Sequence, residues 1–207
     1  MRRLSPVVLV AALICCACDQ PPTKEIAAAE AALVSAEQQG AGEYAPERLA
    51  AARAALTEAQ RRVQAQDYRG GLSAANEAAE KGRAAAKSAE AAKHLVQSAA
   101  ESARDETRIM LEELPAVKDE AAQAHIPAEA FTETDAETAA VEALLTSADQ
   151  AIAKQDFLAA RSKSEDARSK AQVLPDKYRQ ARSDWETAHP KPKPKVKPKP
   201  AKKAPKR

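Results

Sequence analysis

Apolar side chains recur along this chain at alternating spacings of three and four residues, the repeat of a helix that packs one stripe against a neighbouring helix. One stripe after Pro46 consists of Leu49, Ala52, Leu56, Ala59 and Val63. A longer stripe consists of Phe157, Ala160, Ser164, Ala167, Ala171, Leu174, Tyr178, Ala181 and Trp185. It crosses Pro175, where we expect a kink or a break while the same face stays buried. The pattern predicts long helices in close contact.

Composition limits how large the core between these helices can be. The chain has 207 residues, of which 44% are hydrophobic but only 3% aromatic, and alanine is abundant. Alanine is the best helix former, yet each alanine buries little surface. We therefore predict an all-α fold of elongated antiparallel helical hairpins, or a three-helix coiled-coil-like bundle. A roughly spherical enzyme domain is not expected.

Turn-forming residues divide the pattern into six expected helices. The first covers about residues 22–39 and ends at Gly40, a typical C-terminal glycine. The second begins near Pro46. The third is expected to start after the break that includes Gly71 and to run toward Pro115, over more than 40 residues.

The second half of the chain resembles the first at a shift of 89 residues. Residues 55–68 read ALTEAQRRVQAQDY, and residues 144–157 read LLTSADQAIAKQDF. In both copies an aspartate precedes an aromatic residue at a helix junction, where aspartate can cap the next helix and the ring can close the seam. We expect two related helical units, residues 24–114 and 115–188.

The run GAGEYAPERLAAARAALTEAQ and the turn QDY, followed by alanines at helical spacing, lie within residues 26–92. These residues resemble a known family, the alanine-rich lipoprotein domain of unknown function 4398. The resemblance covers about a third of the chain, and the segment GA-x-x-YAP is its most specific part. The residues that carry it are Gly40, Ala41, Tyr44, Ala45, Pro46, Leu49, Ala52, Leu56, Ala59, Asp67, Tyr68, Ala75 and Ala78. It implies a helical, periplasm-facing envelope lipoprotein, and it supplies no catalytic or binding residues.

The QDY turn also resembles tetratricopeptide repeats, in which an aromatic residue and alanines pack two helices together. Those repeats recur about every 34 residues, whereas the recurrence here is 89 and the helices are longer. A repeat-type adaptor that binds a protein or peptide is therefore the alternative hypothesis.

All three cysteines of the chain lie near its start, in the segment LICCACDQPP. Residues 1–18 have a positive start followed by a short apolar run, which is typical of an export signal. A cysteine after a small residue resembles the lipobox of bacterial lipoproteins, in which the cysteine is diacylated and becomes the first residue. We predict lipidation at Cys18, with residues 19–23 as a short linker, and Cys16 is the alternative anchor.

Other interpretations of the cysteines are weaker. A buried N-terminal helix with incidental cysteines is the alternative to an export signal. A metal site would need a further histidine or cysteine nearby, and none is present. The choice of anchor bears on location, because Asp19 after a lipidated cysteine is an inner-membrane retention signal in enteric bacteria, whereas Ala17 after Cys16 favours the outer membrane.

Residues 189–207 form a Lys/Pro-rich tail that we expect to be disordered and extended. It carries a charge of +9, whereas residues 4–190 carry −9. The candidate contacts to an anionic partner are Lys191, Lys193, Lys195, Lys197, Lys199, Lys202, Lys203, Lys206 and Arg207. Peptidoglycan, anionic lipid or an acidic protein would fit, a purely solubilising role stays open, and nucleic acid is not expected for an exported protein.

No catalytic arrangement is found in the sequence. There is no glycine-rich phosphate loop, no set of histidines or cysteines with metal-ligand spacing, and no serine with a histidine–acid pattern, so we expect no metal and no cofactor. The sequence therefore predicts a non-enzymatic structural or interaction lipoprotein. It would be anchored in the bacterial cell envelope, face the periplasm, and contact a partner through its tail.

Overall fold

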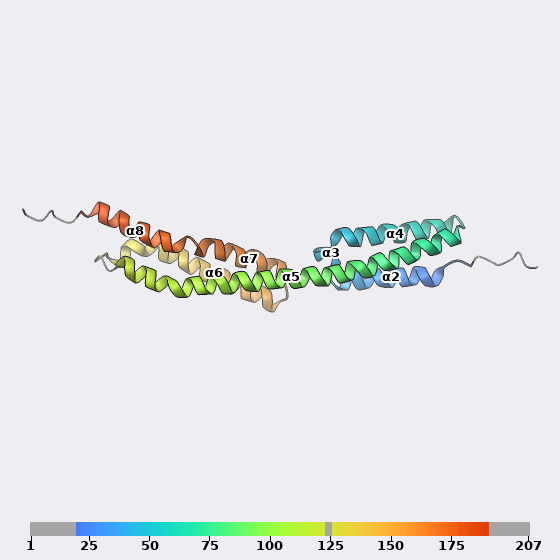
Figure 1. Ribbon diagram of the computed structural model, residues 1–207, viewed down its shortest axis with the longest axis horizontal. Helices are drawn as coiled ribbons and strands as arrows, with labels where there is room; N and C mark the ends of the chain where they lie inside the picture. The colour runs from blue at the N-terminus through green and yellow to red at the C-terminus, as the bar shows by residue number, and fades with distance from the viewer. Residues whose placement is uncertain (1–19, 123–125, 191–207) are drawn as a thin grey trace, which may run out of the picture. The chain divides into compact units, whose positions relative to one another are not determined.

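The structure, a computed structural model, describes residues 20–122 and 126–190. Every regular element within these ranges is a helix, and the predicted all-α class is confirmed (Figure 1). The elements are α2 (Thr23–Gln38), α3 (Ala41–Tyr44), α4 (Pro46–Gln64), α5 (Tyr68–Ala122), the 3-10 helix η2 (Ala128–Phe131), α6 (Thr132–Ala153), α7 (Phe157–Ala171) and α8 (Leu174–Ala188).

The chain forms two compact units, Met1–Val96 and Gln97–Arg207, and the division falls inside α5. We expected the boundary at residues 114 and 115, because a proline usually ends a helix. Instead α5 continues through Pro115 to Ala122. The neighbouring Leu114 is buried in the core of the second unit, and burial of its side chain outweighs one lost backbone hydrogen bond.

The first unit packs α2, α4 and the first part of α5 together (Figure 1). Among its described residues, every buried hydrophobic side chain except Leu33 and Leu49 is an alanine. The helices approach closely where Gly82 of α5 meets Ala32 of α2, since a Cβ atom on Gly82 would lie 3.1 Å from the carbonyl carbon of Ala32. The predicted thin, alanine-packed seam is present in this unit.

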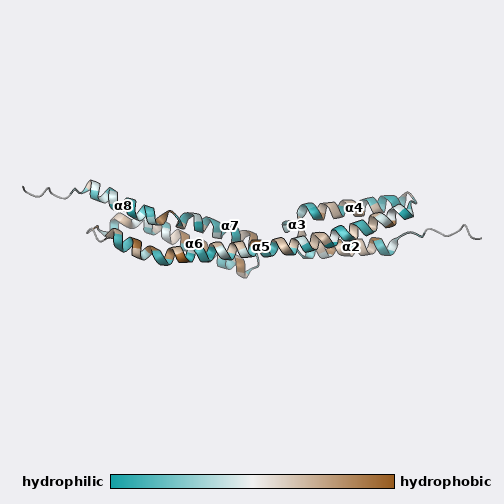
Figure 2. Cartoon of the chain, viewed as in Figure 1, coloured by the Kyte–Doolittle hydropathy of each residue, from teal (hydrophilic) through white to brown (hydrophobic). Residues whose placement is uncertain are grey.

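The second unit packs the rest of α5 with α6, α7 and α8, and its core holds larger side chains. Phe131, Val141, Leu174 and Tyr178 are each at most 2% exposed. The long stripe predicted from Phe157 onward is buried as far as Tyr178. Figure 2 shows apolar and polar residues interleaved along the helices, as expected for helices with one packed face.

The expected interruption near Pro175 is a break rather than a kink. Helix α7 ends at Ala171, and α8 begins at Leu174 with Pro175 in its first turn. Proline is tolerated at that position because its missing N–H would have no partner there. The same face therefore stays buried on both sides of the break.

The two copies of the predicted repeat share one turn geometry. Gln66 and Gln155 each adopt a left-handed backbone conformation, with φ of 63° and 60°. In the first copy the N–H of Asp67 donates to the carbonyl of Arg62 at 3.0 Å, and the equivalent bond in the second copy is 2.9 Å. Each helix thus ends in a Schellman motif with glutamine at the position that glycine usually occupies.

Each turn also caps the helix that follows. The side chain of Asp67 accepts a hydrogen bond from the N–H of Gly70 at 2.9 Å, and Asp156 accepts one from Ala159 at 3.0 Å. Helix α5 therefore begins at Tyr68, and Gly70 and its neighbour lie in its first turn rather than in a break before it. The capping role predicted for both aspartates is confirmed.

Candidate functional site

The site residues predicted from the sequence lie outside the described residues. This applies to Cys18 and the alternative Cys16, and to all nine charged residues between Lys191 and Arg207. Lipidation and binding by the tail therefore stay predictions. The described helices begin at Thr23 and end at Ala188. The predicted lipid anchor precedes them in the sequence, and the predicted binding residues of the tail follow them.

Among the described residues, the net negative charge lies in the second unit. Residues 20–96 carry 10 basic and 10 acidic side chains, a net charge of zero. The described residues of 97–190 carry 11 basic and 19 acidic side chains, a net charge of −8. Residues 112–142 alone hold nine acidic side chains and one lysine, Lys118. This cluster of acidic residues could have been predicted from the sequence. The net charge summed over residues 4–190 does not show where along the chain the acidic residues lie.

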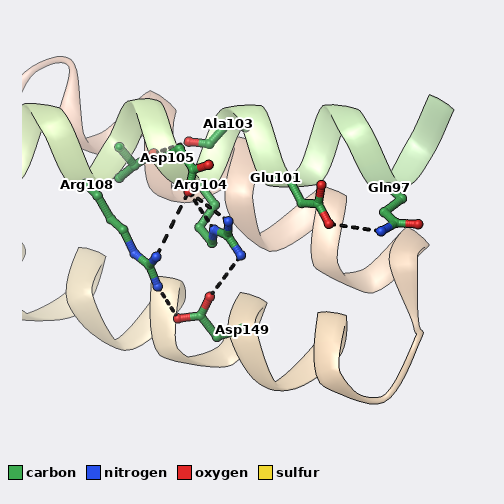
Figure 3. A network of polar contacts seen from close by, with 8 residues as sticks. Gln97, Glu101, Ala103, Arg104, Asp105, Arg108 and Asp149 are labelled. Atoms are coloured by element: carbon green, nitrogen blue, oxygen red, sulfur yellow. Dashed lines mark hydrogen bonds and ion pairs between the residues drawn. The ribbon is translucent and has the colours of Figure 1, made fainter. Parts of the chain in front are cut away.

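An ion-pair network joins α5 to α6 within the second unit (Figure 3). Asp149 of α6 lies 2.7 Å from Arg108 and 3.6 Å from Arg104, and Arg104 also contacts Asp105 at 2.8 Å. Arg104 is the most shielded of the four, with a side chain 20% exposed. Exposed pairs of this kind contribute little to stability individually, so the network mainly fixes the register of two helices.

A polar cluster at the edge of the core connects three helices of the same unit. The Lys118 ammonium donates to both Asp135 oxygens at 2.7 and 2.8 Å, and the Tyr178 hydroxyl donates to Asp135 Oδ1 at 2.6 Å. Burial alone would raise the pKa of the Asp135 carboxyl, but the hydrogen bonds from Lys118 and Tyr178 hold that pKa below its usual value. Burial, reinforced by Asp135, raises the pKa of Tyr178 to about 12.

This polar cluster ties helices of the second unit together. The Tyr178 side chain is 2% exposed, and its ring packs 5.7 Å from that of Phe131. Its hydroxyl already has a partner in Asp135, as has the Lys118 ammonium. With its donors engaged, the cluster stabilises the packing of α5, α6 and α8.

A groove of about 470 Å³ lies between α8 and the segment formed by η2 and the start of α6. We call it the Trp185 groove. Its apolar lining consists of Ala130, Ala181, Trp185 and Ala188, and its polar lining of Glu133, Thr134, Glu137, Lys177, Gln180 and Asp184. It lies at the end of α8, next to the point at which the tail leaves the helices, and no pattern in the sequence predicted it.

The negative charge of the Trp185 groove is only partly neutralised. Glu137 forms an ion pair with Lys177. Asp184 accepts a hydrogen bond from the uncharged Gln180 at 2.7 Å. Glu133 has no ion-pair or hydrogen-bond partner among the described residues. The groove therefore has a net charge of −2 beside an apolar floor.

Within the described ranges, no group of three or more histidine, cysteine, aspartate or glutamate side chains is arranged to hold a metal ion. None of the helices in those ranges combines the length and the apolar character that crossing a membrane requires.

No family model, no curated protein and no solved structure matches this chain. The resemblance to the lipoprotein domain of unknown function 4398 stays a prediction, carried by the residues given above.

Proposed function

We propose that this chain is a non-enzymatic structural or interaction lipoprotein of the bacterial cell envelope. Lipid on Cys18 anchors it, the helical units face the periplasm, and the tail contacts an anionic partner. Two acyl chains on one residue hold a protein stably to a membrane, whereas a single chain is marginal.

The observation that carries this proposal is the segregation of charge along the chain. A tail of +9 follows a unit whose described residues carry −8, and the unit before that is neutral. The tail therefore has a local competitor in its own chain. An external partner has to be more densely anionic than this unit, which favours peptidoglycan or an anionic lipid surface over a mildly acidic protein.

The anchor is tested by metabolic labelling with a fatty acid in a bacterial host. Cys18→Ser is expected to abolish labelling and leave the protein unprocessed, while Cys16→Ser is expected to retain both labelling and processing. If Cys18→Ser is still labelled and Cys16→Ser is not, the anchor is Cys16.

The tail is tested by retention of the chain from residue 19 on purified peptidoglycan and on anionic vesicles. Retention is expected at low salt and is expected to fall as salt rises, since exposed charges are screened beyond about 8 Å at physiological ionic strength. Replacing the eight tail lysines by glutamine should abolish retention, and replacing them by arginine should preserve it. Equal retention of all three forms would favour the adaptor hypothesis, in which the helical units bind the partner.

A further inference from the structure

We propose that the Trp185 groove is an intramolecular docking site for the Lys/Pro-rich tail of the same chain. The groove combines an apolar floor that includes Trp185 with acidic side chains at its edge, among them Glu133 and Asp184. The occupant is a segment of the tail between Lys191 and Arg207. This inference adds to the proposed function a state in which the tail is held by its own chain.

Charge complementarity is the first argument for this occupant. The groove carries a net −2 and belongs to a unit whose described residues carry −8, whereas the tail carries +9 and no acid. Glu133 has no charged or hydrogen-bonding partner among the residues that the structure describes. A lysine ammonium placed beside Glu133 would therefore form a new ion pair without breaking an existing one.

The shape and chemistry of the floor are the second argument. From Lys191 to Pro200 every second residue is lysine, and the positions between are proline except for Val196. Such a segment favours the extended polyproline II conformation, which has little conformational entropy to lose on binding. Proline-rich segments bind grooves lined by aromatic side chains. The ring of His189 stacks on one face of the Trp185 ring, with the centroids 3.8 Å apart. A lysine ammonium, which is attracted to the face of a tryptophan ring, could therefore approach only the other face. The volume of about 470 Å³ lies within the range of ordinary ligand pockets.

The position of the groove along the chain is the third argument. Ala188 is the last residue of α8 and also lines the groove. Only His189 and Pro190 separate it from the first tail lysine. A tether this short gives the tail an effective concentration in the millimolar range, so weak contacts are sufficient for docking within one chain.

If the tail docks, the groove and an external anionic surface compete for the same tail lysines. The docked lysines would be unavailable to a partner until that partner offered a higher density of negative charge. The helical unit would then select for polyanionic surfaces and against isolated anions, without any change in its own fold.

The fluorescence of Trp185 tests this proposal directly, because it is the only tryptophan in the chain. The chain from residue 19 is compared with the same chain whose tail lysines and Arg207 are replaced by glutamine. At about 20 mM salt the two forms are expected to differ in Trp185 emission, and the difference should vanish near about 500 mM, where the screening length falls below about 5 Å. The emission of the native form should not depend on protein concentration.

A triple variant of the groove and a matched control locate the contact. A synthetic peptide of residues 191–207 is titrated into the chain with the neutral tail. Glu133→Gln, Glu137→Gln and Asp184→Asn together should weaken the peptide about tenfold, because each exposed ion pair contributes roughly a two- to fivefold change. The control Glu112→Gln, Asp119→Asn and Glu120→Gln removes the same charge from exposed positions outside the groove and should leave affinity within about twofold.

Carbodiimide crosslinking with mass spectrometry gives a second measurement that does not depend on the variants. Crosslinks from tail lysines to Glu133 or Asp184 within one chain are expected. Three results would overturn the proposal: identical Trp185 emission with native and neutral tails, equal weakening by both triple variants, or crosslinks that form only between different chains. No envelope component is present in these experiments, so such a failure would leave the tail's proposed external contacts unaffected.

Discussion

Gln66 and Gln155 lie 89 residues apart and share a left-handed backbone conformation that no other non-glycine residue adopts in residues 20–122 and 126–190. Each follows the second long helix of its unit and precedes the aspartate that caps the third. The same hydrogen bonds close both turns. The internal repeat is therefore a repeat of turn geometry as well as of sequence.

Replacing Gln66 or Gln155 by glycine is expected to stabilise its unit. A left-handed conformation costs a non-glycine residue about 1–2 kcal/mol, and glycine avoids this cost. Glycine also has more conformational freedom in the unfolded chain, which lowers stability by part of that amount. The free energy of unfolding is therefore expected to rise by about 0.5–1 kcal/mol. Thermal unfolding followed by circular dichroism measures it. Gln172→Gly is the control, since Gln172 ends a helix with a right-handed φ of −57°, and a stabilisation there of the same size would contradict the argument.

Ser164→Ala is expected to raise stability by about 1 kcal/mol, because an unsatisfied buried polar group costs about 1–3 kcal/mol. Ser164 is fully buried, and its hydroxyl has no hydrogen-bond partner within residues 20–122 and 126–190. Alanine already occupies the equivalent position in the first unit, Ala75, which is equally buried. Chemical denaturation provides the measurement.

Thr107 provides the contrast to Ser164. It is also fully buried, but its hydroxyl donates to the carbonyl of Ala103 at 2.6 Å. Thr107→Val should therefore be neutral or destabilising. A gain in stability equal to that of Ser164→Ala would show that the missing partner is not the cause.

Tyr178→Phe is expected to destabilise the second unit by about 1 kcal/mol near neutral pH, since it removes a hydrogen bond to the Asp135 carboxylate. The variant should also change the response to alkali. Burial raises the pKa of Tyr178 to about 12, so the unfolded chain, with a tyrosine pKa of about 10, loses this proton first. The stability from Tyr178 is thus complete below about pH 10 and is lost between about pH 10 and 12.

Ultraviolet titration of tyrosinate tests the same assignment. The native chain should show one component that titrates near pH 12, and Tyr178→Phe should remove it. Tyr68→Phe is the control, because Tyr68 is half-buried and lies outside this polar cluster, so the late component should persist. Loss of the late component in Tyr68→Phe would refute the assignment to Tyr178.

Leu56→Asp is expected to destabilise the first unit strongly, by about 3 kcal/mol or more, because it puts a charge without a partner against the core. Leu56 packs against two alanine-rich clusters on the seam. Leu95→Asp is the matched control, since Leu95 is 73% exposed and the change there should be within about 0.5 kcal/mol. Similar losses in the two variants, measured by thermal unfolding, would contradict the packing described for the seam.

Much of the fold could be predicted from local patterns in the sequence. The stripe that contains Leu49 and Leu56 and the stripe that starts at Phe157 are both packed against neighbouring helices, because helical spacing places their side chains on one face. The aspartates of the two turns cap helices, since this role depends only on residues three positions away. These features are local in sequence.

The features that were missed depend on contacts between distant segments. Helix α5 passes through Pro115 because residues on either side of it, such as Leu114, are buried by other helices. The pairing of Asp135 with Lys118 and Tyr178 joins positions 17 and 43 residues apart in the chain. No spacing rule within one helix indicates such contacts, and the same is true of the Trp185 groove.

The alanine-lined seam of the first unit has a calorimetric consequence. Unfolding raises the heat capacity mainly in proportion to the apolar surface it exposes, and alanine side chains around Leu33 and Leu49 expose little of it. The first unit should therefore unfold with a smaller heat-capacity increment per residue than the second, whose core holds Phe131 and Tyr178. Its stability should change more gently with temperature, so the first unit should be the less sensitive of the two to cooling.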